Sequence, residues 1–189
     1  MINRSLTVLL LMILAVPGLR ADDAAKTSEV RLKDLVLQLP NTWKTAPSAG
    51  NMRLATYTTP VADGDSEPGE FTVFSFAGGG GGVADNLSRW VGQFSSDGRT
   101  SKITKGMAGE TEYYVADISG TFNKPVGPPI LRKTEAAPGF RMLAAIVVLE
   151  GKGVYYLKLS GPDATIKAQA EAFRASFGGD SKTETDFEI

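Results

Sequence analysis

The stretch FTVFSFAGGGGGVADNLSRWVGQF, residues 71–94, joins a strand pattern to a helix pattern through five glycines. Residues 71–76 are aromatic and β-branched, as strands prefer. After Gly78–Gly82, apolar residues recur at the spacing of one helix face: Val83, Leu87, Trp90, Val91 and Phe94. The stretch therefore predicts a central strand, a glycine loop and an amphipathic helix that buries Trp90.

The rest of the chain predicts a sheet with short connections. Apolar and β-branched patterns predict strands at about residues 32–39, 52–58, 112–122, 141–150 and 154–160, and a closing helix from Asp163 to Phe177. The short glycine-bearing turn at residues 150–153 indicates a hairpin. We therefore predict an α+β fold, a mainly antiparallel central sheet with helices on its faces (an α/β/α sandwich). Residues 123–139 are expected to form a long loop that either faces a partner or connects two strands.

The N-terminus has the order of a secretory signal peptide. Arg4 precedes an apolar run, Leu6–Val16, which is followed by the helix breaker Pro17-Gly18 and by Ala21. We expect cleavage after Ala21 and export to the periplasm or the cell exterior, with no transmembrane segment afterwards. Retention as an anchor is the alternative, because Leu19 stands where a small residue is preferred. The expected organisation is a signal peptide (1–21), a linker (22–28), a single domain (29–178) and a mobile acidic tail (179–189).

The composition argues against several classes of function. The chain contains no cysteine and no histidine, so thiol chemistry, disulfides and the commonest imidazole ligands and bases are absent. We therefore expect no metal centre and no cofactor. Removal of residues 1–21 leaves 18 basic and 21 acidic groups, since Arg4 and Arg20 lie in that segment. The basic residues are scattered, which argues against a nucleic-acid partner.

The glycine run is the most unusual local feature. Backbone N–H groups at the start of a helix can bind an anion. The candidate ligand-binding residues are Gly80, Gly81, Gly82, Asn86 and Arg89. However, a phosphate loop ends in Gly-Lys-Ser/Thr, whereas Asp85 places a carboxylate in the first helical turn here. A loop that only needs the conformational freedom of glycine to join strand and helix is the alternative interpretation.

Several short motifs together resemble a known group of proteins. They are Leu39-Pro40, Trp43-Lys44, Met52-Arg53-Leu54-Ala55, Phe74-Ser75-Phe76, the glycine run, Asn86-Leu87-Ser88-Arg89-Trp90, Gln93-Phe94 and Leu159-Ser160-Gly161-Pro162. Over roughly residues 32–177 the chain resembles uncharacterised exported bacterial proteins of the PsbP-like fold, which PsbP and the Ran-binding protein Mog share. The resemblance implies a central antiparallel sheet between helices, used to dock another protein rather than for catalysis.

These observations predict a function only in outline. We expect an exported, non-enzymatic binding or assembly module whose partner is another exported protein. The alternative is a protein that binds a small anionic or polar ligand at the glycine loop. A hydrolase that uses carboxylates or a Ser/Lys pair is least favoured, because no Gly-x-Ser-x-Gly motif and no histidine base are present.

Overall fold

A computed structural model describes residues 26–48, 52–76, 80–127, 129–131 and 133–189. The predicted signal peptide, with its cleavage site after Ala21, lies outside these residues, and so does most of the predicted linker. Gly78 and Gly79 of the glycine run also lie outside them.

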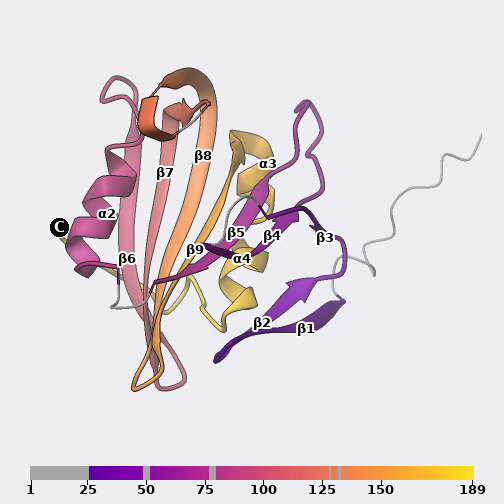
Figure 1. Cartoon of the computed structure of the whole chain (residues 1–189), viewed down its shortest axis with the longest axis vertical. Helices are drawn as coiled ribbons and strands as arrows, with labels where there is room; N and C mark the ends of the chain where they lie inside the picture. Colours follow the sequence, from indigo (N-terminus) through magenta and orange to yellow (C-terminus); the bar gives the residue numbers. More distant parts are fainter. Residues whose placement is uncertain (1–25, 49–51, 77–79, 128, 132) are drawn as a thin grey trace, which may run out of the picture.

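Eight strands form one antiparallel sheet in the order β10-β6-β7-β8-β9-β5-β4-β3 (Figure 1). The strands are β3 (Lys44–Thr45), β4 (Arg53–Thr58), β5 (Glu70–Ser75), β6 (Thr100–Ala108), β7 (Thr111–Pro125), β8 (Thr134–Leu149), β9 (Gly153–Pro162) and β10 (Thr185–Asp186). The long strands β7 and β8 pair from Glu112 and Val148 at one end to Pro125 and Thr134 at the other. Both are interior strands, with β6 on the other side of β7 and β9 on the other side of β8.

Short helices and a separate hairpin cover the two faces of this sheet. The helices are α2 (Val83–Val91), α3 (Asp163–Ala168), α4 (Ala170–Ser176) and the 3-10 turn η1 (Pro129–Leu131). The hairpin consists of β1 (Thr27–Leu32) and β2 (Leu35–Pro40). Figure 1 shows α2 on one side of the sheet and α3, α4 and the hairpin on the other.

Successive side chains along each strand point to opposite faces of the sheet, so the apolar ones form one core on each face. On the α2 face, Leu87, Trp90 and Phe94 pack against sheet residues such as Ile118 and Tyr156. The opposite core contains the hairpin leucines, the aromatic residues of α4 and inward-facing strand residues: Leu35, Leu37, Leu39, Phe173, Phe177, Phe71, Val115, Leu157 and Leu159. The predicted burial is therefore confirmed for Leu87, Trp90 and Phe94. Val91, which was expected to be buried with them, is only partly buried.

The predicted α/β/α sandwich is wrong, because the fold is β-rich: of the residues that the structure describes, 51% are in strands and 15% in helices. The second face is covered in part by the β1–β2 hairpin, whose leucines occupy space that a helix layer would fill. The expected loop at 123–139 is also mostly strand. Pairing passes from Gly120–Phe140 to Phe122–Ala137, so a bulge accommodates Pro138 and Gly139 within β8. The proline therefore does not end the strand.

Part of the C-terminal segment 179–189, for which the sequence predicts a mobile tail, pairs with the sheet. Thr185 and Asp186 pair with Lys105 and Thr104 of β6. The Phe187 ring packs edge-on against Tyr114, with 4.9 Å between ring centroids. The tail thus extends the sheet by one short strand.

Candidate functional site

The described part of the glycine loop has a conformation that requires glycine at Gly80. Gly80 and Gly81 have φ angles of 65° and 95°, in the left-handed region that side chains disfavour. A Cβ atom at Gly80 would lie 2.9 Å from both the Phe76 ring and the Tyr156 hydroxyl. Close approach to the sheet therefore explains this glycine without any ligand.

Asn86 fastens the glycine loop to the first turn of α2. Its buried amide nitrogen donates hydrogen bonds to the carbonyl oxygens of Gly80, at 3.1 Å, and Gly82, at 2.8 Å. Its Oδ1 atom accepts a hydrogen bond from the Arg89 guanidinium. Asn86 therefore positions both the loop and Arg89, and its amide group is already used.

An anion at the N-terminus of α2 would meet a carboxylate. A Cβ atom at Gly82, the residue before the helix, would lie 3.1 Å from Oδ2 of Asp85. The negative charge of Asp85 already occupies the positive end of the helix dipole. The predicted anion site on the loop backbone thus stays a prediction, and the arrangement of Asp85 argues against it.

Arg89 instead lines a hollow between α2 and strands β5 and β9, which we call the α2–β9 cleft. Its cavity of about 160 Å³ is lined by Phe74, Phe76, Arg89, Trp90, Gln93, Tyr156 and Lys158. A second hollow of about 550 Å³ shares Gln93 and Lys158 with the first and extends to Arg53 and Lys124. Cationic side chains and aromatic rings therefore converge at one place on the α2 face.

Lys158 lies at the junction of the two hollows. Strand alternation places Leu157 and Leu159 in the opposite core, so Lys158 projects toward α2. Its ammonium donates a hydrogen bond to Oε1 of Gln93, at 3.0 Å. The pKa of Lys158 is lowered from 10.5 to about 8, chiefly by burial and also by the charges of Arg89 and Arg53, while the charge of Glu70 partly opposes this shift.

The cleft contains more positive charge than its carboxylates balance. Arg53 forms an ion pair with Glu70, at 3.2 Å, and Lys124 lies 3.9 Å from Glu67. By contrast, the hydrogen bonds described above lead from Arg89 and Lys158 to amide oxygens, which carry no charge. This arrangement favours a negatively charged ligand.

We expect Lys158→Met to raise the free energy of unfolding at pH 7 by about 1–3 kcal/mol. The pKa of Lys158 is lower in the folded protein than in the unfolded chain, so between pH 8 and 10.5 the unfolded chain binds more protons than the folded protein does. The free energy of unfolding of the wild type should therefore rise with pH across this window. Below pH 8, the full cost of burying the charged ammonium should lower the stability of the wild type.

Urea unfolding of both proteins between pH 7 and 9.5 measures this effect. Lys152→Met, which changes an exposed lysine in the turn before β9, is the matched control and should keep the wild-type pH dependence. A Lys158→Met protein that is less stable at pH 7, or that keeps the same rise with pH, would contradict the expected burial cost.

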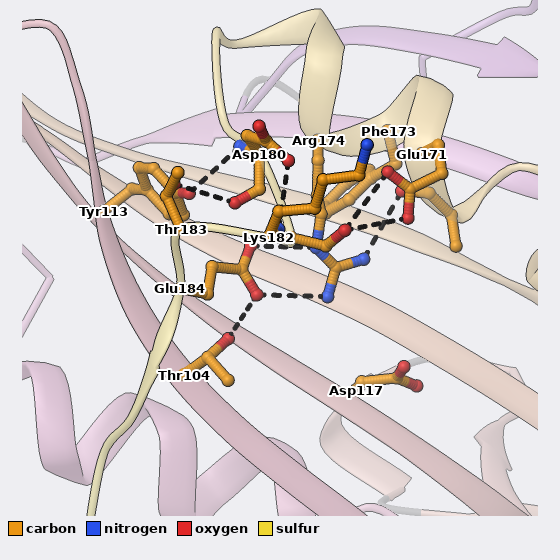
Figure 2. Close-up of polar contacts among 12 residues, drawn as sticks. Thr104, Tyr113, Asp117, Glu171, Phe173, Arg174, Asp180, Lys182, Thr183 and Glu184 are labelled. Carbon is orange, nitrogen blue, oxygen red and sulfur yellow. Dashed lines mark hydrogen bonds and ion pairs between the residues drawn. The ribbon is translucent and has the colours of Figure 1, made fainter.

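A second cluster of charged side chains lies between α4 and the C-terminal tail and stabilises the fold (Figure 2). Arg174 Nε donates a hydrogen bond to Glu184 at 2.8 Å, and the Thr104 hydroxyl donates to the same carboxylate at 2.7 Å. Nearby, Arg141 lies 2.7 Å from Asp117 and bridges to α3. Opposite charges satisfy one another here, so the cluster fixes the tail to the sheet rather than attracting a charged ligand.

The described residues contain neither a metal-binding cluster nor a membrane-spanning helix. Among these residues, no group of three or more Asp or Glu side chains is arranged to hold a metal ion. Within the same part of the chain, no helix has the length and apolar character needed to cross a membrane.

Comparisons with known proteins do not place the chain in a family. No family model matches it, and no curated protein matches it either. Among solved structures, it is similar to PA94, a protein of unknown function from Pseudomonas aeruginosa, with 13% sequence identity and a TM-score of 0.43. The similarity covers 80% of this chain and 93% of PA94. Similarity at this level carries no functional argument, and the resemblance to the PsbP-like fold stays a prediction.

Proposed function

We propose that the protein is an exported, non-enzymatic binding module that recognises an anionic group, a carboxylate or a phosphate, in the α2–β9 cleft. The observation that carries this proposal is the convergence of Arg89 and Lys158, both hydrogen-bonded to neutral amides, at one hollow. A guanidinium and an ammonium are the usual partners of carboxylate and phosphate groups.

The walls of the cleft indicate what the anionic group is attached to. Phe74, Phe76, Trp90 and Tyr156 provide apolar and aromatic surface around the two cations. The 160 Å³ cavity is smaller than a typical drug-sized site, so it fits a single group of a few heavy atoms. The adjoining hollow of about 550 Å³ has room for the remainder of a ligand. An anionic group on an aromatic or apolar body fits both features.

The same contacts leave a hydrolase as the least favoured function. A Ser/Lys mechanism requires a lysine that removes a proton from a serine hydroxyl. In the described contacts, the Lys158 ammonium donates to Gln93 rather than to a serine. We therefore retain binding as the proposal.

Thermal unfolding with phenyl phosphate, benzoate and inorganic phosphate tests the proposal. We expect phenyl phosphate to raise the melting temperature most, because it combines an anion with an aromatic ring; saturation at 100 times Kd corresponds to about 2.7 kcal/mol. Arg89→Ala should weaken binding about tenfold or more, whereas Lys152→Met should not change it. The proposal fails if no anion stabilises the protein, or if Arg89→Ala binds phenyl phosphate as tightly as the wild type.

A further inference from the structure

We propose that Lys158 is a reactive amine that forms an imine with aldehydes that carry an anionic group. This inference rests on the proposed anion binding in the same cleft, because the cations there would hold the aldehyde beside the amine. It adds a covalent, reversible step to a site for which binding alone was proposed above.

The geometry of the cleft provides the two parts of such a site. Lys158 lines both hollows, and the contact of its Nζ atom with Gln93, at 3.0 Å, is to a neutral acceptor that leaves the nitrogen able to lose its proton. Arg89 is on α2, on the other wall of the smaller hollow, and Asn86 holds its guanidinium. If Arg89 binds the anionic group of such an aldehyde, the carbonyl carbon of the same molecule would therefore lie next to the Lys158 amine.

The electrostatic surroundings favour the neutral amine that the reaction requires. The titratable groups that line the two hollows together with Lys158 are Arg89 of α2, Arg53 of β4, Glu70 of β5, Tyr156 of β9, Lys124 of β7, and Glu67. Burial and the two arginines lower the pKa of Lys158 to about 8. About a tenth of the side chain is then neutral at pH 7, far more than for an ordinary lysine.

The reaction balances without a further reagent. The nitrogen lone pair attacks the aldehyde carbon, and a proton moves from nitrogen to the former carbonyl oxygen to give a carbinolamine. The carbon–oxygen bond then breaks, and the oxygen leaves as water with a second proton from nitrogen. The products are an imine and one water molecule, and no oxidation or reduction occurs.

Reductive labelling with pyridoxal 5′-phosphate tests the inference on the purified protein. Borohydride converts an imine to a stable secondary amine, which peptide mapping by mass spectrometry locates. At pH 7–8 and limiting aldehyde, we expect Lys158 to carry at least tenfold more label than any exposed lysine, such as Lys152. Pyridoxal without the phosphate should label Lys158 several-fold less. Label spread evenly over the lysines would overturn the proposal.

Two measurements separate this inference from the proposed anion binding. Excess phenyl phosphate should protect Lys158 of the wild-type protein from the label, and Arg89→Ala should lower the label to the level reached with pyridoxal; its melting temperature establishes that this variant folds. If phenyl phosphate binds and Lys158 is not labelled, the imine proposal fails and anion binding stands. If Lys158 is labelled equally by both aldehydes, the amine is reactive but the anion-binding role of Arg89 fails.

Discussion

Trp90→Ala is expected to lower the free energy of unfolding by about 3–5 kcal/mol, because truncation of a buried tryptophan leaves a large cavity. The Trp90 side chain is 3% exposed and packs edge-on against Tyr156, with 6.2 Å between ring centroids. It lies between Leu87 and Phe94 at the contact of α2 with the sheet. Such a loss is a large share of the 5–15 kcal/mol that stabilises a typical domain.

The second tryptophan of the chain makes this prediction easy to measure. Trp43 is buried in the core on the opposite face, where its indole nitrogen donates a hydrogen bond to Gln169 at 2.9 Å. Trp43 fluorescence therefore reports urea unfolding of the Trp90→Ala protein. Ser88→Ala, an exposed change on the same helix, is the control and should alter stability by less than about 0.5 kcal/mol. If Trp90→Ala unfolds at the wild-type urea concentration, α2 does not pack as described.

Regular apolar periodicity predicted the elements that carry a continuous buried face. Residues 71–76 and 83–94 were predicted as strand and helix, and the structure has β5 at 70–75 and α2 at 83–91. The helix ends earlier because Gly92 follows Val91, while Phe94 still reaches the core through the next turn.

Strands that bury few side chains left no such pattern. β6 has the sequence TSKITKGMA, in which Thr104 is buried and Ile103 only partly so, and its outer neighbour is the two-residue strand β10. β1 is likewise mostly exposed, so residues 27–32 resemble a polar linker. These strands form because their backbones pair with a neighbouring strand, and few of their side chains are buried. The sequence alone does not show which segment of the chain is that neighbour.

The sequence predicts the residues of the candidate site that lie on α2 but not those that lie on the sheet. Asn86 and Arg89 were recognised from their position after the glycine run, and the structure joins them by a hydrogen bond. Lys158 was missed because alternation in β9 places it on the face opposite the leucine core, where a charged residue is ordinarily solvated. Lys158 lines a cleft only because α2 lies over that face of the sheet. Since α2 and β9 are far apart in the sequence, no local sequence pattern indicates that they come together.

Glu184→Ala is expected to lower the free energy of unfolding by about 3–5 kcal/mol, because it leaves a buried cation without its carboxylate. The side chains of Arg174 and Glu184 are 9% and 3% exposed, and their ion pair is 2.8 Å long. After the substitution, the Arg174 guanidinium would keep a hydrogen bond to the Ala170 carbonyl oxygen, at 3.4 Å. The Thr104 hydroxyl would also lose its acceptor.

Two comparison variants show whether the lost charge pair causes this effect. Glu188→Ala removes an exposed carboxylate from the same tail and should leave stability unchanged. The double substitution Arg174→Met with Glu184→Leu should recover most of the loss, since apolar replacement of a buried ion pair is often neutral or stabilising. Hydrogen exchange of Phe187, whose amide donates to the Ile103 carbonyl oxygen of β6 at 2.9 Å, should accelerate in Glu184→Ala. Wild-type stability in Glu184→Ala, with unchanged exchange at Phe187, would mean that the ion pair does not hold the tail on the sheet.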